Sequence, residues 1–278
     1  MKLKFVGRGA MLYPEEGNTA AYFEDDNNFF LLDCGEDVAA KLIRDGKLTK
    51  EKEYYLFITH THSDHIGSLG TLQQYLYWCC GKKLNIVISK QMKYLKQIQE
   101  ILNGFGLEPT TYQMVDEETL DNHFSTFHSI RYVRSNHGDT PLTSCAIVIS
   151  DEKGNTLYTG DIADATILKE FITYNGEHNI DQIYVDTSLS KSPVHLSLEE
   201  LVEVVPDSLK GQVNCMHIND AKLFPKIEEC GFKVVSPLED MSLESLERLS
   251  QQLQQKLEKV EQQILEQQKV KTFKSGGN

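Results

Sequence analysis

Three histidines and one aspartate lie within six residues of one another, directly after an apolar run at 54–58. They are His60, His62, Asp64 and His65. Imidazole and carboxylate groups are the ligands that Zn²⁺ and similar divalent ions take in proteins. While the chain is still extended, the side chains of His60 and His62 point to the same side, and Asp64 and His65 follow as the chain turns into a helix. One loop can therefore supply ligands to two neighbouring metal positions.

The pattern H-x-H-x-D-H after an apolar strand resembles that of the metallo-β-lactamase superfamily. The resemblance extends over residues 1–235. It implies an α/β fold, the four-layered αβ/βα sandwich, with the metals at one edge. Residues 5–10 (FVGRGA) and 31–36 (LLDCGE) are similar to the start of ribonuclease Z-like members, so the resemblance also suggests that subgroup.

Three further residues, each at the end of a short apolar run, match later ligands of this family. His137 resembles the third histidine of the first metal, Asp161 in T-G-D resembles the aspartate that bridges both metals, and His217 resembles the last ligand of the second metal. The resemblance implies a first site of His60, His62, His137 and Asp161, and a second site of Asp64, His65, Asp161 and His217. We expect two divalent ions, with Zn²⁺ as the first choice and Mn²⁺ as the alternative.

His195 is the candidate for a general acid. It stands just before Ser197 and Glu200, which have the spacing of a capping box at the start of a helix. The free N–H groups of a helix N-terminus suit phosphate oxygens. In ribonuclease Z-like enzymes a histidine shortly before the last metal ligand donates to the scissile phosphate or the leaving group, and here 217 − 195 = 22 residues separate the two. The resemblance implies this role for His195, whereas a surface histidine beside a helix is the alternative. We expect Asp64 to orient the attacking water.

The charge of the chain bears on its partners. Acidic residues exceed basic ones by 41 − 28 = 13 among 278 residues. Because Lys and Arg supply most of the affinity for nucleic acids, this balance weighs against long polynucleotides as the main partner. No apolar run approaches the roughly 20 residues that cross a bilayer, and the six cysteines include no C-x-x-C pair. We expect a cytoplasmic protein without a membrane partner, in the host cytoplasm if a phage encodes it.

Short apolar runs of strand length recur along the chain and give way to amphipathic helical periods. We expect strands at 3–6, 20–23, 29–32, 54–58, 84–88, 130–133, 146–149, 182–185, 213–216 and 232–235, and helices at 36–44 and 91–102. The strands first come in consecutive groups and then alternate with helices. This order predicts sheets wrapped by helices rather than a simple doubly wound fold.

The composition changes after residue 237. Apolar residues then follow one another at steps of 3, 4, 4, 3 and 4 in a background rich in Gln, Glu and Lys; they are Leu246, Leu249, Leu253, Leu257, Val260 and Ile264. Such a stripe predicts a helix with one stutter in its heptads. We therefore expect a hydrolase domain at 1–237, a helix at 238–271 and a disordered tail at 272–278. The helix either lies along its own domain or forms a coiled coil between two subunits.

The spacing between His137 and Asp161 limits the size of the substrate that we expect. Asp161 follows His137 by 161 − 137 = 24 positions, a spacing that two strands and a hairpin turn fill. The long arm by which true ribonuclease Z enzymes grip tRNA, usually placed here, does not fit. An acidic chain without an arm resembles the phage-encoded anti-Pycsar nucleases, homodimers that degrade cyclic CMP and cyclic UMP. The resemblance implies a dinuclear phosphodiesterase of small cyclic nucleotides that acts as a homodimer. A tRNA 3′-processing endonuclease, or another metallo-hydrolase of the superfamily, is the alternative.

Overall fold

A computed structural model describes residues 1–89, 95–138 and 142–237, and five single residues further along. The chain divides into two compact units, Met1–Pro237 and Leu238–Asn278. Within the helix predicted at 238–271, the structure describes Ser250, Gln251, Gln254, Leu257 and Val260, and all five are helical. The rest of that segment and the predicted tail at 272–278 lie outside the described residues. All elements below belong to the first unit.

The first half of the chain forms one six-stranded sheet. Its strands are β1 (Lys4–Gly7), β2 (Ala20–Glu24), β3 (Asn28–Leu32), β4 (Glu53–Phe57), β5 (Leu84–Ile88) and β6 (Tyr112–Asp116), and they pair in that order. The first three strands are antiparallel neighbours, whereas β3 to β6 run parallel. The helical elements here are η1 (Pro14–Glu16), α1 (Val38–Arg44), α2 (Ser63–Ile66), α3 (Leu69–Tyr75), η2 (Leu76–Cys80), α4 (Leu95–Gly104) and η3 (Glu117–Leu120).

The second half forms a second six-stranded sheet with the order β12-β11-β10-β9-β8-β7. Its strands are β7 (Ser129–Ser135), β8 (Ser144–Asp151), β9 (Gly154–Tyr158), β10 (Ile180–Asp186), β11 (Val213–Met216) and β12 (Lys233–Val234). Strands β7 to β9 are antiparallel neighbours, and β9 to β12 run parallel. The helical elements are α5 (Thr166–Asn175), η4 (Glu177–Asn179), α6 (Leu198–Val204), η5 (Asp207–Gln212) and α7 (Leu223–Glu229).

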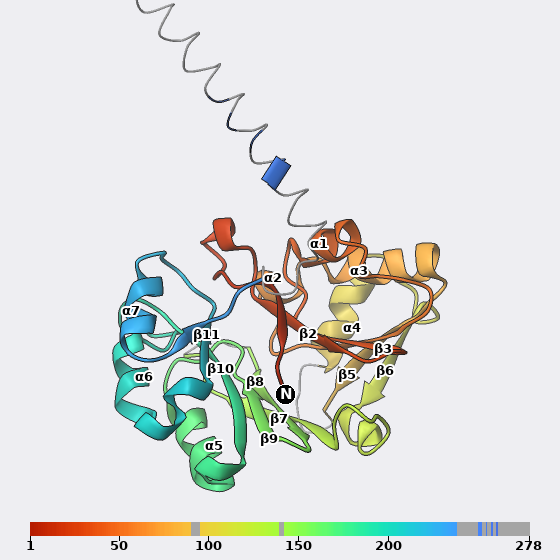
Figure 1. Cartoon of the computed structure of the whole chain (residues 1–278). Helices are drawn as coiled ribbons and strands as arrows, with labels where there is room; N and C mark the ends of the chain where they lie inside the picture. The colour runs from red at the N-terminus through yellow and green to blue at the C-terminus, as the bar shows by residue number, and fades with distance from the viewer. Residues whose placement is uncertain are drawn as a thin grey trace, which may run out of the picture. The chain divides into compact units, whose positions relative to one another are not determined.

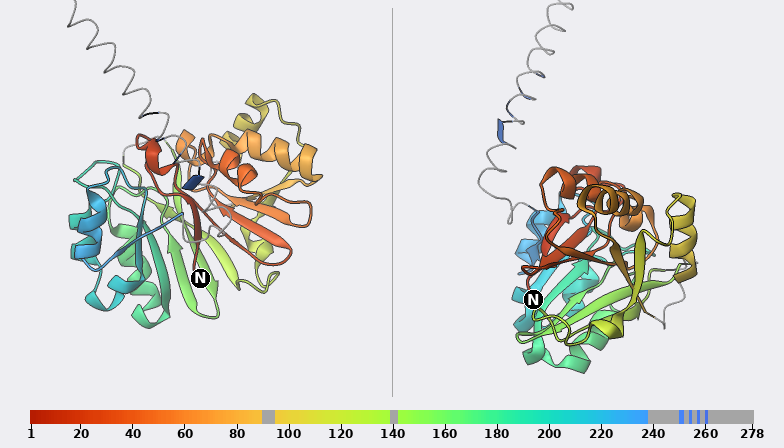
Figure 2. Two further views of the ribbon diagram at one scale, coloured as in Figure 1. Left: turned by 45° about the horizontal axis from the view of Figure 1, so that its top comes forward. Right: turned by 90° about the vertical axis from the view of Figure 1, so that its right-hand side faces the viewer.

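The two sheets face each other between layers of helices, as Figure 2 shows on the left. In Figure 1, α5, α6 and α7 lie outside the second sheet, while α1, α3 and α4 accompany the first. Alternation along the strands explains the layers, since successive side chains point to opposite faces. In β10, for example, Tyr184 joins the core between the sheets, whereas Ile183 and Val185 join the core under the helices. The predicted α/β architecture of two sheets and covering helices is confirmed.

The predicted strands differ from the observed ones mainly at one edge of the first sheet. No strand is expected from the sequence at residues 112–116, yet β6 lies there at the edge of the first sheet. Only Tyr112 of this strand is buried, so its residues carry little apolar alternation. The helix expected at 91–102 is observed as α4 from Leu95, and residues 90–94 lie outside the described part of the chain.

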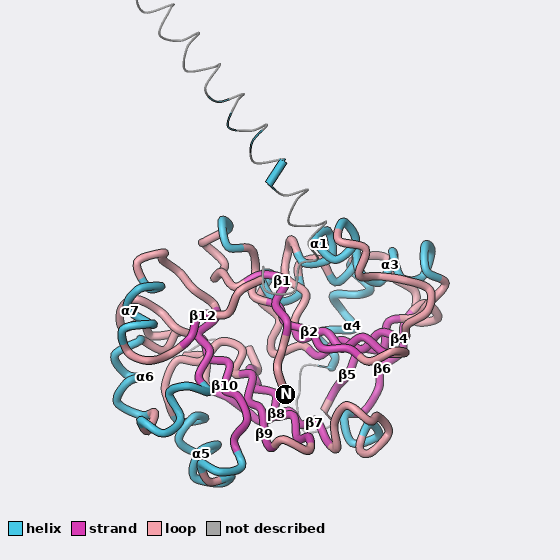
Figure 3. The backbone as a smooth tube through the Cα atoms, in the orientation of Figure 1, coloured by secondary structure: helices cyan, strands magenta, loops and turns pink. Residues whose placement is uncertain are grey.

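Strand direction gathers the predicted site residues at one edge. Strands β7, β9, β10 and β11 all run the same way, because β8 is antiparallel to both β7 and β9. Their carboxyl ends therefore meet, and polar residues follow or end each of them: His137, Asp161, Asp186 and His217. Figure 3 shows these strands in magenta, ending in loops drawn in pink.

Candidate metal centre

The metal-binding loop begins where β4 ends. Phe57 is the last residue of the strand, and α2 begins at Ser63 with His62 as its N-cap. His60 is fully buried and His62 is half-buried. The chain is extended at His62, as the sequence predicts, and then turns so that Asp64 and His65 lie on the short helix.

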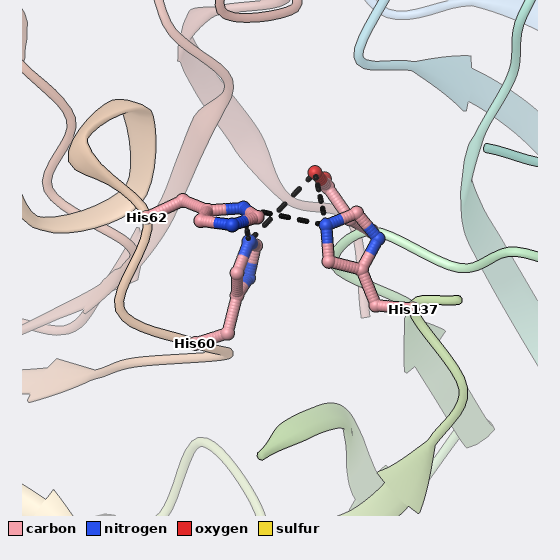
Figure 4. Close-up of side chains that lie close together, drawn as sticks. His60, His62 and His137 are labelled. Carbon is pink, nitrogen blue, oxygen red and sulfur yellow. Dashed lines mark hydrogen bonds and ion pairs between the residues drawn. The ribbon is translucent and has the colours of Figure 1, made fainter. Parts of the chain in front are cut away.

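His60, His62 and His137 turn their rings toward one another (Figure 4). His60 Nε2 lies 2.9 Å from His62 Nδ1, which lies 3.3 Å from His137 Nε2. One oxygen of Asp161, Oδ2, lies 3.8 Å from His60 Nε2 and 3.7 Å from His137 Nε2. The structure therefore brings together all four residues predicted for the first site, two from each sheet.

The three imidazoles of this first group are held neutral. Burial lowers the pKa of His60 well below 6.5, and the neighbouring His65 acts in the same direction. Burial likewise lowers the pKa values of His62 and His137, outweighing the attraction of nearby carboxylates. A neutral imidazole keeps a lone pair for a metal ion, so this electrostatic environment suits ligation.

Asp64, His65, Asp161 and His217 form the second group, and all four are buried. His65 Nε2 lies 3.2 Å from Asp161 Oδ1 and 3.4 Å from an oxygen of Asp64. His217 Nε2 lies 3.2 Å from Asp64 Oδ2 and 3.3 Å from Asp161 Oδ1. The two oxygens of Asp161 thus face different groups: Oδ2 faces the first and Oδ1 faces the second.

The electrostatics of the second group differ from those of the first. Burial lowers the pKa of His217, but the carboxylates of Asp161, Asp186 and Asp64 outweigh burial and raise this pKa to about 10. The pKa of His65 is also raised well above 6.5, because Asp161 and Asp33 outweigh burial. Carboxylates that hold a proton on these rings would equally attract a divalent ion in place of that proton.

Several buried polar atoms of the seven candidate ligands have no hydrogen-bond partner, and they show whether these residues suit metal ions. Asp64 Oδ1, His65 Nε2 and Asp161 Oδ1 are buried and have no hydrogen-bond partner. A buried polar atom without a partner is costly, so such atoms mark a place for an unseen group. Nitrogen and oxygen donors in sets of four also match the preference of Zn²⁺. The residues present therefore fit divalent ions.

Asp33 is a member of the centre that the sequence analysis missed. It follows β3, has a φ of +64°, and is fully buried. Its Oδ1 accepts from Thr59 N (2.8 Å), and its Oδ2 accepts from His65 Nδ1 (2.9 Å). Asp33 therefore orients the imidazole of His65 with Nε2 toward Asp161. A carboxylate directly after an apolar strand is the signal that could have found it.

Asp186, the last residue of β10, is a second member of the centre that was not expected from the sequence. Like Asp33, it is a single carboxylate at the end of an apolar strand. Its Oδ2 accepts from His195 Nδ1 (2.9 Å) and Ile162 N (3.1 Å), and its Oδ1 lies 3.4 Å from His217 Nδ1. Burial lowers the pKa of His195, but the bond to Asp186 outweighs it and the net shift is upward. His195 lies beside both groups, with its ring centroid 4.9 Å from that of His217 and 5.5 Å from that of His137.

The helix after His195 has fewer free N–H donors at its N-terminus than we expected for an anion site. The capping box of Ser197 and Glu200 is present, as predicted. Its bonds, however, occupy the donors: Ser197 N donates to Glu200, Leu198 N donates to Ser188 O, and Glu200 N donates to Ser197 Oγ. Two glutamates also lie in the first turn. Three backbone N–H groups at this helix end are therefore already bonded within the protein.

Comparison with known proteins identifies the family. The family described as Anti-Pycsar protein Apyc1 matches residues 1–237. The chain belongs to this family. It is similar to the Anti-Pycsar protein Apyc1 of Bacillus phage BSP38, with 24% identity over 240 residues, which cover 79% of this chain and 89% of the relative. The segment beyond residue 237 lies outside the family match.

Solved structures confirm the metallo-β-lactamase fold. The metallo-β-lactamase fold protein YhfI from Bacillus subtilis has a TM-score of 0.65 at 19% identity, covering 84% of this chain and 94% of that one. The short form of human tRNase Z has a TM-score of 0.59 at 16% identity, covering 87% and 98%. These likenesses show the predicted fold, and the family match shows the family. Among the described residues, no helix is both long and apolar enough to cross a membrane.

Proposed function

We propose that this chain is a dinuclear phosphodiesterase that hydrolyses small cyclic nucleotides, such as cyclic CMP and cyclic UMP, to linear monophosphates. The observation that carries the proposal is the pair of donor groups that share Asp161, with His195 beside both. Family membership supports the same conclusion, because the relatives are anti-Pycsar proteins.

The two donor groups assign the ligands. The first ion would be held by His60, His62, His137 and Asp161, and the second by Asp64, His65, Asp161 and His217. Two divalent ions supply activation of water and neutralisation of charge on phosphate oxygens. Zn²⁺ is our first choice because imidazole nitrogens make up most of the donors, and Mn²⁺ is the alternative. Asp64 keeps its buried Oδ1 without a hydrogen-bond partner, and we assign it the orientation of the attacking water.

His195 is the proposed general acid. Its Nδ1 donates to Asp186, which leaves Nε2 to hold or release a proton. The side chain is 23% exposed, whereas Asp186 is fully buried. A partly exposed imidazole on a buried carboxylate can reach a ligand while keeping its orientation. We propose that His195 protonates the departing oxygen of the phosphodiester.

The absence of an arm favours a small substrate. Strand β8 ends at Asp151 and β9 begins at Gly154, so only two residues connect them. The connection between His137 and Asp161 is therefore a tight hairpin, apart from residues 139–141, which lie outside the description. The formal charge of −13 disfavours a long polyanion such as tRNA as the substrate. A tRNA 3′-processing endonuclease remains the second candidate.

The oligomeric state and the place of action are part of the proposal. We propose a homodimer that acts in the cytoplasm; for a phage-encoded chain this is the host cytoplasm. Phage-encoded relatives support that setting. The apolar stripe beyond residue 237 is a candidate element of the dimer, because Leu257 and Val260 are 59% and 49% exposed.

One competition assay tests the proposed substrate. Purified protein with Zn²⁺ or Mn²⁺ receives a panel of 3′,5′-cyclic mononucleotides together with a 3′-extended precursor tRNA. We expect linear monophosphates to form while the tRNA stays intact. Cleavage of the tRNA trailer with the cyclic nucleotides untouched would overturn the proposal. The double variant His60→Ala/His62→Ala is the control: turnover that survives in it would arise outside the proposed centre.

A further inference from the structure

Three tyrosines of the second sheet reach across to the first. Tyr132 Oη, from β7, accepts from Ile58 N (3.0 Å), and Tyr184 Oη, from β10, accepts from Leu3 N (2.8 Å). Tyr158, the last residue of β9, differs from both, because its hydroxyl donates to a carboxylate, Asp33 Oδ2, over 3.2 Å. The hydroxyl of Tyr158 thus reaches the side chain that orients a predicted metal ligand.

Asp33 Oδ2 is the meeting point of three donors. It accepts from His65 Nδ1 (2.9 Å), from Thr59 Oγ1 (2.9 Å) and from Tyr158 Oη. Thr59 and His65 both belong to the first half of the chain, on the metal-binding loop. Tyr158 is the donor from the second sheet, so its bond fixes the carboxylate relative to the opposite half of the molecule.

Tyr158 lies close in the chain to Asp161, so its hydrogen bond to Asp33 links two predicted ligands. Asp161 lies three residues after Tyr158, just beyond the end of β9. The end of β9 therefore positions two predicted ligands. It carries Asp161 directly, and it holds His65 in place through the Tyr158 phenol and Asp33. His65 Nε2 and Asp161 Oδ1 lie 3.2 Å apart. The phenol couples the positions of the two atoms that would share the second ion.

The surroundings of Tyr158 keep it a hydrogen-bond donor. Its side chain is fully buried, so water does not replace the hydroxyl easily. Burial, with Asp33 adding to it, raises the pKa of Tyr158 well above its usual value of 10. The phenol is therefore neutral over the whole range in which the enzyme would work, and it donates throughout.

We infer that Tyr158 is a positioning residue for the second metal ion: through Asp33 it holds His65 in register with Asp161. The inference rests on the proposed assignment of His65 and Asp161 as ligands of that ion. Outer partners of ligating histidines typically change metal affinity by 10–100-fold when they are removed. Loss of the phenol hydroxyl should act at that scale on the second ion alone.

Tyr158→Phe tests the inference, and Tyr184→Phe is its matched control. Both changes remove one buried hydroxyl that links the two sheets, but Tyr184 bonds the backbone of Leu3, away from the ligands. The measurement is Zn²⁺ affinity and stoichiometry in competition with a chromogenic chelator, together with the urea midpoint of each metal-free protein. We expect Tyr158→Phe to bind one of two ions about 10–100-fold more weakly, while Tyr184→Phe keeps the parental affinities. Excess Zn²⁺ should restore kcat of Tyr158→Phe.

Failure of the inference and failure of the ligand assignment give different results. Equal metal affinities in Tyr158→Phe and Tyr184→Phe would overturn the inference and leave Tyr158 a purely structural link. His65→Ala, measured alongside, tests the underlying assignment: if it still binds two ions, the proposed ligand set fails rather than the role of Tyr158. Should Tyr158→Phe not fold, Asp33→Ala removes the acceptor of the same bond, and unchanged affinity for both ions in that variant would also contradict the inference.

Discussion

At the level of single residues, the centre depends on which ring nitrogen of each histidine carries a proton. His137 Nδ1 donates to the carbonyl of Val194 (2.9 Å), and His65 Nδ1 donates to Asp33. His217 Nδ1 faces Asp186. His65 and His137 thus use Nδ1 for a hydrogen bond within the protein, which leaves Nε2 as the nitrogen that can bind an ion. His62 is the exception, because it presents Nδ1 to its neighbours.

The first prediction concerns His195. His195→Gln removes the proposed acid but keeps a polar side chain of similar reach, so we expect kcat to fall by roughly 10²–10⁴-fold. The metal content should stay at the parental value, because His195 is outside both ligand sets. Steady-state kinetics and elemental analysis of the same sample measure the two quantities. His178, which is exposed, provides the control: His178→Gln should be unchanged. Parental kcat in His195→Gln would refute the assignment.

Sequence reasoning reached the candidate ligands but not the residues that hold them. His60 to His65 are recognisable because four ligand types crowd one short loop. Asp33 and Asp186 are single carboxylates at strand ends, where aspartate also serves as an ordinary turn residue. Their role becomes visible only when the fold places them beside His65, His195 and His217.

At the level of elements, the close approach of two strand ends shapes the centre. Gly160, just before Asp161, has a φ of +57°, and a Cβ there would lie 2.7 Å from the Cβ of Thr59. Thr59 in turn precedes His60. The two loops that carry ligands from opposite sheets therefore touch at a position where only glycine fits.

Element boundaries were predictable where apolar runs are strong, as in β11, and not where they are weak, as in β6.

Gly160→Ala tests this approach, with Gly46→Ala as its matched control. Both glycines have a positive φ, +57° and +65°, but a Cβ at Gly46 would meet nothing within 4 Å. Each variant should lose about 1 kcal/mol from the backbone conformation. Gly160→Ala should lose roughly 1–3 kcal/mol more from the steric clash, and its metal affinity should fall. Urea unfolding and chelator competition measure both effects. Equal losses in the two variants would show that the loops do not touch here.

At the scale of the whole molecule, each sheet supplies part of the centre. The first sheet carries His60, His62, Asp64 and His65, and the second carries His137, Asp161 and His217. Ions bound between the sheets would bind the folded unit and not the unfolded chain, so they stabilise the packing of the two halves. The family match ends at residue 237, where the first compact unit also ends.

Removal of the residues after Pro237 tests the independence of that unit. Because the second compact unit begins at Leu238, we expect the truncated chain to fold, to keep its metals and to keep the kcat of the full chain. Circular dichroism, elemental analysis and kinetics check this. Sedimentation of both forms locates the pairing: a monomer after truncation assigns the dimer contact to the C-terminal segment, and an unchanged dimer assigns it to the first unit. Failure of the truncated chain to fold would contradict the division.

The central claim is that two ions share Asp161, and anomalous X-ray scattering from a crystal grown with Zn²⁺ tests it most directly. Data on either side of the zinc absorption edge show where zinc lies. We predict two peaks flanking the carboxylate of Asp161, one among His60, His62 and His137 and the other among Asp64, His65 and His217. A single peak, or peaks away from Asp161, would contradict the dinuclear centre.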